Sequence, residues 1–319
     1  MFAKGARAAI ALLLAVCSGV SAQSPAKLSS VGPQACAETR SSCADFDAVV
    51  FVHGIYGDDE TFRNQTTGFD WPSAFPRVIK DRSIDVYRLN YQSALLNWSG
   101  QKNPEFDSVA TAIFAAMAPL RKRNYRSIGF IAHSLGGNLV STYIHDVKSG
   151  RGHPERAQNA YYITLATPVL GADIASIASP LKQMLAIDDD LLKSLTTQNL
   201  YLRMLKHFRD AEGPKGERLG CRAVHLHAAY EQSRVGPLTV VGVDSAALSI
   251  ANMVASPIIG FPLDHFAIAK PRSASDPVFV WVNDRVVSEF GRLEEWDVAR
   301  ASVPARFRLC ERAEYLGEP

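Results

Sequence analysis

The chain has 319 residues, of which 47% are hydrophobic and 21% are charged, and its formal net charge is +2 at pH 7. This length accommodates one large α/β domain or two small domains, and the composition is typical of a globular protein. No run of lysine and arginine stands out, so the chain lacks the basic stretch that is typical of nucleic-acid-binding proteins. We therefore expect no nucleic-acid partner.

The first 22 residues have the pattern of a secretory signal peptide. Lys4 and Arg7 precede an apolar run from Ala8 to Val16, and small residues lead to Ala22, which predicts cleavage after that residue. The apolar run is shorter than the roughly 20 residues that a transmembrane helix needs. We therefore expect an exported mature chain, periplasmic or extracellular, without a transmembrane segment.

Four cysteines remain after this segment is removed: Cys36, Cys43, Cys221 and Cys310. In an oxidising compartment they predict two disulfides. Cys36 and Cys43 flank a short polar loop, which favours a local bridge within an N-terminal tail at 23–46. Cys221 would then pair with Cys310. A zinc site at these cysteines is the competing interpretation, and the absence of CxxC spacing and of histidines at ligand spacing beside them disfavours it.

Strands and helices are predicted to alternate from residue 47 onward. Short apolar runs are typical of strands buried on both faces of a parallel sheet; they lie at 47–54, 84–91, 127–134, 160–167, 222–230 and 238–244. Helical spacing occurs at 106–124, 135–147 and 277–293, where Ser275 or Asp276 is a candidate cap for the last helix. This alternation predicts an α/β fold, a mostly parallel sheet flanked by helices, in one domain over 47–319.

Residues 171–210 interrupt this alternation. Leucine and isoleucine recur there at helical spacing, which is compatible with ordinary core helices or with a helical cap above the sheet. We adopt a helical cap that shapes the pocket as the hypothesis.

The segment Ala132-His133-Ser134-Leu135-Gly136 is a variant of G-x-S-x-G, placed between a predicted strand and a predicted helix. In that context the motif forms a sharp turn that holds the serine in a strained, exposed pose. Ala132 replaces the first glycine and adds only a methyl group. The alternative is a tight connection in which the hydroxyl caps the helix. The context favours Ser134 as a nucleophile.

An activated serine needs donors for the oxyanion. His53-Gly54 ends the first buried strand, so the backbone N–H of Ile55 is expected to join that of Leu135 as the oxyanion hole. His53 itself is expected to shape the turn by hydrogen bonding.

The segments VFVHGIYGD, IGFIAHSLGG, ITLATPVLGAD and DHFAIAKP occur in this order in the chain. In these motifs it resembles the α/β-hydrolase superfamily, in particular the lipase and esterase relatives of GPI-inositol deacylase and of the serine-active-site-containing protein. The resemblance covers roughly residues 47–290. It implies an α/β-hydrolase fold and cleavage of an ester or related acyl bond by a serine, acid and histidine triad.

Chain order selects the remaining catalytic candidates. In this fold the histidine comes last, on the loop after the final strand, which favours His265. The acid lies between the nucleophile and that histidine. Glu231 directly follows the strand at 222–230, and the resemblance also favours it; Asp244 is the main alternative and Asp173 the third. His225 and His227 alternate on that strand, so one or both are expected to be buried and hydrogen-bonded.

These observations predict a serine hydrolase that cleaves carboxylic esters through an acyl-enzyme. This mechanism requires no metal and no organic cofactor, so we expect neither. The expected partner is an ester or lipid-like small molecule, with transient contact to a lipid surface. Acyl transfer and amide hydrolysis use the same triad and stay open as alternatives. A non-catalytic binding protein on the same scaffold is less favoured because every candidate member of the triad is present.

Overall fold

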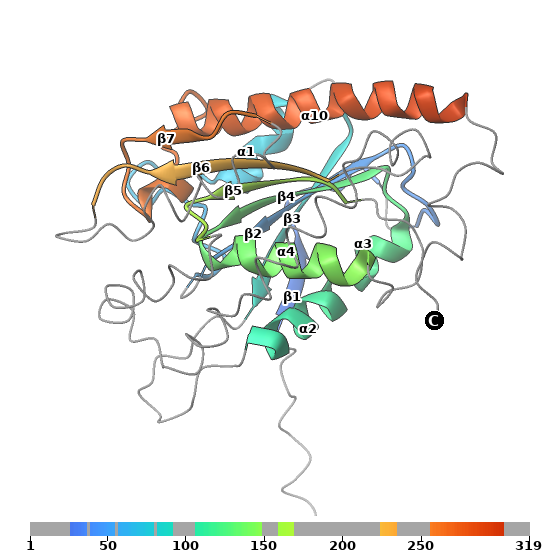
Figure 1. The fold of residues 1–319 in the computed structure, drawn as a ribbon, viewed down its shortest axis with the longest axis horizontal. Helices are drawn as coiled ribbons and strands as arrows, with labels where there is room; N and C mark the ends of the chain where they lie inside the picture. Colours follow the sequence, from blue (N-terminus) through green and yellow to red (C-terminus); the bar gives the residue numbers. More distant parts are fainter. Residues whose placement is uncertain are drawn as a thin grey trace, which may run out of the picture.

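The structure is a computed structural model, and it describes residues 26–36, 39–54, 57–79, 82–91, 106–148, 159–168, 224–234 and 256–302. Within these ranges a twisted sheet lies between two layers of helices (Figure 1).

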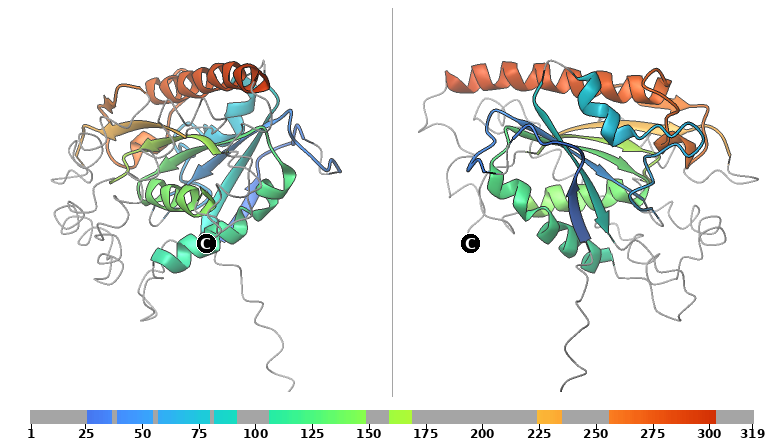
Figure 2. Two further views of the ribbon diagram at one scale, coloured as in Figure 1. Left: turned by 45° about the vertical axis from the view of Figure 1, so that its right-hand side comes forward. Right: turned by 180° about the vertical axis from the view of Figure 1, so that it is seen from behind.

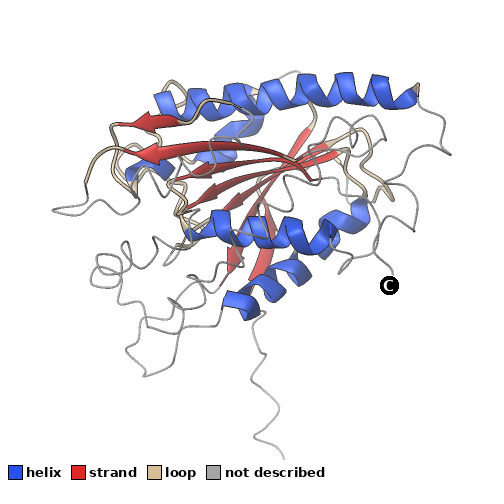
Figure 3. Ribbon diagram, in the orientation of Figure 1, coloured by secondary structure: helices blue, strands red, loops and turns tan. Residues whose placement is uncertain are grey.

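The strands lie side by side in one sheet (Figure 3). In the described residues this sheet has seven strands in the order β1-β3-β2-β4-β5-β6-β7. Their bounds are Ala26–Ser30 (β1), Asp47–Val52 (β2), Ile84–Tyr91 (β3), Ser127–His133 (β4), Asn159–Leu165 (β5), His225–Glu231 (β6) and Ile259–Phe261 (β7). Strands β2 to β7 are parallel, and β1 pairs antiparallel with β3 at one edge. The carboxyl ends of the parallel strands therefore meet along one side of the sheet, where α/β proteins place their ligand sites.

The helices divide between the two faces of the sheet (Figure 2). Helices α1 (Trp71–Val78) and α10 (Pro277–Ala301) cover one face. Helices α2 (Phe106–Ala116), α3 (Ala118–Arg123) and α4 (Leu135–Lys148) cover the other. A short 3₁₀ helix, η3 (Ala267–Ala269), precedes α10.

Strand β2 shows how one short sequence serves both helical layers. Every residue of β2 is buried, and alternate side chains point to opposite faces. Val50 and Val52 pack in the layer of α2 and α4. Phe51 points to the other side, where its ring lies edge-on to Trp71 and Phe75 with centroids 5.8 Å away in each case. Burying such side chains contributes about 1.5–3 kcal/mol each, which explains the continuous apolar run.

The predicted strands at 47–54, 84–91, 127–134, 160–167 and 222–230 are confirmed as β2 to β6. The last helix begins at Pro277, as predicted, with Asp276 accepting the Val278 N–H at 3.2 Å. The predicted strand at 238–244, the cap at 171–210 and the signal peptide at 1–22 lie outside the described residues.

The structure adds one element to the predicted tail at 23–46, because Ala26–Ser30 forms the edge strand β1 on β3. One prediction is wrong in detail. The helix at 106–124 is two helices, α2 and α3, which meet at Met117. Pro119 in the first turn of α3 has no N–H to donate to α2, and this favours a new helix start there. Helix α1 and the short strand β7 were not predicted.

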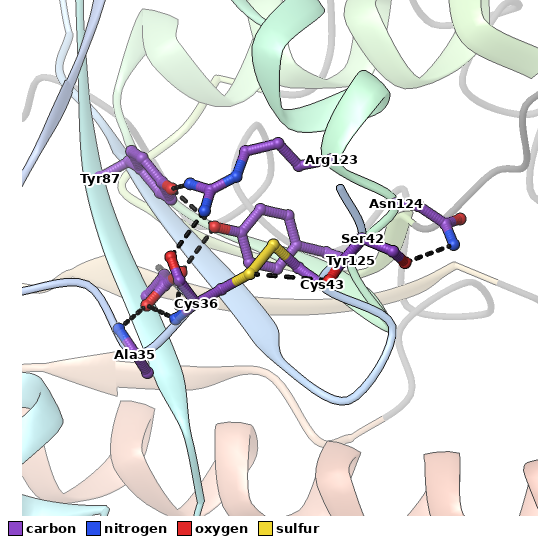
Figure 4. Close-up of a disulfide and its surroundings, with 9 residues drawn as sticks. Ala35, Cys36, Ser42, Cys43, Tyr87, Arg123, Asn124 and Tyr125 are labelled. Carbon is purple, nitrogen blue, oxygen red and sulfur yellow. Dashed lines mark hydrogen bonds between the residues drawn. A yellow bond between two sulfur atoms is a disulfide. The ribbon is translucent and has the colours of Figure 1, made fainter. Parts of the chain in front are cut away.

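The disulfide between Cys36 and Cys43 is confirmed, and it ties the chain beyond β1 to the sheet (Figure 4). Both cysteines are fully buried. Arg123 donates from one guanidinium nitrogen to the Cys36 carbonyl at 2.6 Å and from the other to the Tyr87 hydroxyl at 3.2 Å. Asp85 accepts the Cys36 N–H at 3.2 Å. Hydrogen bonds from the backbone of Cys36 therefore connect the disulfide to Asp85 of β3 and to Arg123 of α3. Cys221 and Cys310 lie outside the described residues.

Within the described part of the chain, every helix is too short or too polar to cross a bilayer.

Candidate active site

Ser134 occupies the sharp turn between β4 and α4. Its φ angle is 51°, in the left-handed region that side chains other than glycine seldom adopt. The Ser134 N–H donates to the Leu165 carbonyl at 2.9 Å, and the Gly137 N–H donates to the Ser134 carbonyl at 3.0 Å. The surrounding backbone therefore holds the strained residue in place, as a nucleophile turn requires.

Two glycines allow neighbouring backbone to approach this turn. A Cβ on Gly54 would lie 2.7 Å from the Ser134 Cβ, and a Cβ on Gly136 would lie 2.3 Å from the His53 carbonyl oxygen. The end of β2 and the start of α4 therefore come together only because both residues lack a side chain. At Ala132 a methyl group is accommodated, fully buried in the core.

His265 lies on the loop between β7 and η3. Its own neighbour Asp264 stabilises the turn that follows, because the Asp264 carboxylate accepts the N–H groups of Phe266 and Ala267 at 2.9 and 2.8 Å. The Asp264 carboxylate therefore accepts hydrogen bonds from the loop backbone. The His265 imidazole makes its hydrogen bonds to other residues.

Glu231 is the last residue of β6, and its side chain is buried. Two backbone hydrogen bonds join the loop after Glu231 to the loop of His265. The Gln232 N–H donates to the Phe261 carbonyl at 2.8 Å, and the Ser233 N–H donates to the Leu263 carbonyl at 3.1 Å. These two hydrogen bonds fix the loop that follows Glu231 against the loop that carries His265.

The three side chains form one row of hydrogen bonds. His265 Nε2 lies 3.0 Å from Ser134 Oγ, and His265 Nδ1 lies 3.2 Å from Glu231 Oε1. All three residues are at most 3% exposed. With Nδ1–H donating to the carboxylate, Nε2 is free to accept the serine proton. The structure therefore brings Ser134, His265 and Glu231 together at the carboxyl side of the sheet, from positions far apart in the chain.

Helix α4 starts immediately after the serine, and this affects charge at the site. The Leu135 N–H belongs to the first turn of the helix, where N–H groups have no acceptor within the helix. The helix N-terminus also carries partial positive charge. Both features favour an anion beside Ser134. Ile55, the other predicted donor, and the alternative acids Asp244 and Asp173 lie outside the described residues.

His133 makes a contact with the loop of His265 that the sequence analysis did not predict. His133 Nε2–H donates to the His265 carbonyl at 2.7 Å, and the two ring centroids are 4.9 Å apart. Burial holds the pKa of His133 well below its usual range, and the nearby His265 adds to this effect. A neutral imidazole thus holds the loop that carries His265, and its position next to Ser134 was the signal available in the sequence.

His53 shapes the end of β2, as predicted. Its Nδ1–H donates to the Gly54 carbonyl at 2.8 Å, and the Tyr91 N–H donates to its Nε2 at 3.1 Å. The Tyr91 ring stacks on the imidazole, and the Tyr91 hydroxyl donates to the His53 carbonyl at 2.8 Å. Burial lowers the pKa of His53. A neutral His53 therefore holds the backbone that leads to the predicted oxyanion donor.

His225 and His227 are hydrogen-bonded, as predicted, but their partner is far away in the sequence. Both imidazoles contact Glu289 Oε1 at 2.9 Å, where Glu289 is a residue of α10. Burial alone would raise the pKa of Glu289, but the two histidines and Arg292 outweigh it and hold this pKa below its usual value. This cluster involves no residue of the Ser134 row.

Comparisons with known proteins agree with the fold. The Bacillus licheniformis lipase BlEst2 superposes with a TM-score of 0.51 at 18% identity, over 80% of this chain and 97% of that one. The phospholipase PlaB from Legionella pneumophila gives 0.52 at 15% identity, over 80% of this chain and 62% of that one. At these identities the likeness establishes the α/β-hydrolase fold. A search of curated protein sequences gives no significant match.

A family model described as "Putative serine esterase (DUF676)" matches residues 47–207, just over half of the chain. The matched part contains the turn of Ser134 and the end of β2. The chain therefore belongs to the DUF676 family, and it is a serine hydrolase of the esterase and lipase type.

Proposed function

We propose that Ser134, His265 and Glu231 are the catalytic triad of an enzyme that hydrolyses carboxylic esters. The observation that carries this proposal is the row of hydrogen bonds from Ser134 Oγ through His265 to Glu231, at 3.0 and 3.2 Å. The strained turn at Ser134 supports it independently, because such strain at a buried turn is typical of a functional site.

In the first step His265 Nε2 takes the proton of Ser134 while Oγ attacks the ester carbonyl carbon. The carbonyl oxygen becomes an oxyanion, which the N–H groups of Leu135 and Ile55 stabilise. The C–O bond to the alcohol then breaks, and the leaving oxygen receives the proton from His265. The acyl group remains on Oγ.

In the second step water replaces the alcohol. His265 removes a proton from water as it attacks the acyl-enzyme, and then returns that proton to Ser134 Oγ as the acid departs. Glu231 accepts Nδ1–H in both steps, so that it orients the imidazole and stabilises its charged form. Every step uses side chains and backbone of this chain.

We assign the acyl group to the apolar, lipid-like class. Phe266 directly follows His265 and is 39% exposed, although most large apolar side chains of the described part are buried. An exposed aromatic ring beside the catalytic imidazole offers a surface for an apolar chain. The lipase BlEst2 and the phospholipase PlaB are among the proteins of the same fold. A helical cap at 171–210 would complete the pocket, with transient contact to a lipid surface.

The assignment of Ser134 is tested by labelling with a fluorophosphonate probe, which reacts with activated serines. We expect the wild-type chain to be labelled and Ser134→Ala to be unlabelled. Ser141→Ala is the matched control, because Ser141 is a buried serine within helix α4, the helix that begins directly after Ser134. Persistent labelling of Ser134→Ala would refute the assignment.

The substrate class is tested with p-nitrophenyl esters of graded acyl length on the purified mature chain. A rise in kcat/KM with chain length that is reduced in Phe266→Ala supports the apolar assignment, and a preference for acetate in both proteins contradicts it. Added alcohols or amines separate hydrolysis from acyl transfer, because a transferase forms the new ester or amide in place of the free acid. Anilide analogues test the amidase alternative in the same way.

We also propose that the chain is exported after cleavage behind Ala22. The basic residues, the apolar run and the small residues of this segment support it, and the Cys36–Cys43 disulfide suits an oxidising compartment. Mass spectrometry of the secreted and cell-bound fractions is expected to show a mature chain that begins at Gln23. A chain that retains Met1 in the cytoplasm would contradict this.

A further inference from the structure

A second group of imidazoles and a carboxylate lies at the opposite end of β6 from Glu231. His225 and His227 are two residues apart on the strand, so their side chains point to the same face of the sheet. Glu289 reaches them from α10, which covers that face. His225 Nδ1 and His227 Nε2 each lie 2.9 Å from Glu289 Oε1. The three donor atoms all lie within 4.8 Å of one another.

Each of the two buried members of this group also has a partner on its far side. The other ring nitrogen of His227, Nδ1, lies 2.8 Å from Ser256 Oγ. The other carboxylate oxygen of Glu289 accepts from Arg292 Nε at 2.6 Å, and Arg292 also donates to the Ala160 carbonyl at 3.0 Å. Outer hydrogen bonds of this kind orient the ligands of metal ions, and they fix the imidazole tautomer.

We propose that His225, His227 and Glu289 bind a divalent transition-metal ion, with Zn²⁺ as the preferred ion. Two imidazole nitrogens and one carboxylate oxygen are a donor set that zinc takes, with a water as the fourth ligand. A tetrahedral ion with bonds of about 2.0 to 2.1 Å holds its ligand atoms about 3.3 Å apart. The two nitrogen-to-oxygen separations are 2.9 Å, and all three donor atoms lie within 4.8 Å of one another, so rotations of the side chains would bring them to that spacing.

The charges and ligand types around His225, His227 and Glu289 determine which metal ions this site would prefer. Of the two Glu289 carboxylate oxygens, Oε2 accepts from Arg292 and Oε1 faces the imidazoles. A single carboxylate beside a guanidinium is a poor site for Ca²⁺ or Mg²⁺, which prefer several oxygen ligands. Two neutral nitrogen ligands favour zinc, cobalt or nickel instead. A His227 ring that binds the ion through Nε2 carries its proton on Nδ1, where Ser256 Oγ, at 2.8 Å, can accept it.

The ion would have a structural role. Glu231 is four residues beyond His227 on the same strand, so the ion would lie about 13 Å from the triad carboxylate at 3.3 Å per residue. It would instead join β6 to α10. The side chain of His225 is 22% exposed, whereas those of His227 and Glu289 are 3% exposed. Ions would therefore enter past His225.

The experiment uses the full-length mature chain without a histidine tag, stripped with EDTA and then dialysed. Titration with Co²⁺ is expected to produce the visible absorption of a tetrahedral ion, saturating at one equivalent, and Zn²⁺ is expected to displace it. Zn²⁺ is also expected to raise the melting temperature by several degrees, because a ligand that binds only the folded state stabilises it. Ser134→Ala is expected to bind the ion as the wild type does, which separates this site from the triad.

Variants locate the ion. Glu289→Gln is expected to abolish the Co²⁺ absorption and the melting shift. Glu294→Gln is the matched control on α10, because Glu294 pairs with Arg82 at 2.5 Å outside the cluster, and it is expected to bind normally. Ser256→Ala is expected to weaken binding by about 10- to 100-fold, as removal of an outer partner does.

If Glu289→Gln does not fold, His225→Ala replaces it, because His225 is the most exposed member. The proposal is overturned if the wild-type chain shows neither tetrahedral Co²⁺ absorption nor a Zn²⁺-dependent melting shift at high-micromolar ion. It is overturned equally if a folded Glu289→Gln or His225→Ala binds Co²⁺ as tightly as the wild type.

Discussion

Two hydrogen-bonded rows, each made of a serine, a histidine and a glutamate, lie near opposite ends of β6. They differ in the backbone conformation of the serine. In the first row His265 connects Ser134 to Glu231, and in the second His227 connects Ser256 to Glu289. The imidazole is reversed in the second row, where Nδ1 meets the serine and Nε2 meets the carboxylate.

Ser134 alone has the features of a nucleophile. It has a positive φ angle, and α4 begins directly after it. Ser256 is absent from the positive-φ residues of the described part of the chain. Glu289 also accepts from a second imidazole and from Arg292. A row of serine, histidine and acid is therefore not by itself evidence of a catalytic site, because the backbone of the serine must also present Oγ and donors for an oxyanion.

The largest effect that tests this difference is expected from Glu231→Gln. The amide is expected to donate to His265 Nδ1 and to favour the wrong tautomer, so kcat/KM for a p-nitrophenyl ester falls by about 10²- to 10⁴-fold. The melting temperature stays close to that of the wild type, because a neutral amide is less costly to bury than a carboxylate. A loss below tenfold would assign the acid to another residue, and Asp244→Asn is the next variant to measure.

The same substitution in the second row is expected to act on stability. Glu289→Gln leaves the partly buried Arg292 guanidinium without its charged partner, which destabilises the fold by about 1 to 3 kcal/mol. Urea unfolding in the presence of EDTA measures this value, while kcat/KM per folded molecule stays within about twofold of the wild type. Glu294→Gln removes an exposed ion pair and is expected to change stability by less than about 1 kcal/mol. A strong loss of turnover in folded Glu289→Gln would make the two rows functionally alike.

The parts of the fold that were predictable are those that a local pattern determines. Strands β2, β4 and β5 are buried on both faces and are continuous apolar runs. Strand β1 has the sequence AKLSS, and its place depends on antiparallel pairing with β3, about sixty residues away. Strand β7 has only three residues, IGF, too few for a periodicity to be visible. Edge strands therefore need the tertiary partner before they become recognisable.

The candidate site divides in the same way. Ser134 has a local motif, and His265 follows from chain order once the fold is assumed. The choice between Glu231 and Asp244 depends on which carboxylate faces the imidazole, a property that the sequence leaves open. Glu289 is separated from His225 by 64 residues, and no motif connects them. Contacts between a strand and a distant helix are invisible to local patterns.

A smaller effect is expected at His133, which is neutral in the folded chain. Its folded pKa is below the unfolded value of about 6.5, so the unfolded chain binds more protons and stability falls as pH drops below about 6.5. His133→Gln keeps an N–H donor for the His265 carbonyl and does not titrate. Urea unfolding at about pH 7.5, 6 and 5 is expected to show a pH slope reduced by up to about 1.4 kcal/mol per unit.

The remaining slope in His133→Gln comes with the same sign from His53, whose pKa is also lowered. His133→Leu is the companion variant, because it removes both the titration and the donor. It is expected to lower kcat/KM more than His133→Gln does, since the loop of His265 loses its anchor. An unchanged pH slope in both variants would show that the pKa of His133 is not lowered by folding.

The smallest effect isolates the strain that separates Ser134 from Ser256. Ser134→Gly and Ser134→Ala both remove the hydroxyl and its bond to His265, but only glycine adopts a φ of 51° without a steric penalty. We expect Ser134→Gly to be more stable than Ser134→Ala by about 1 kcal/mol. At Ser141, within α4, the order is expected to reverse by a similar amount, because glycine is the poorer helix former. If glycine were the less stable residue at both positions, the turn would carry no strain, and Ser134 would lose the property that distinguishes it from Ser256.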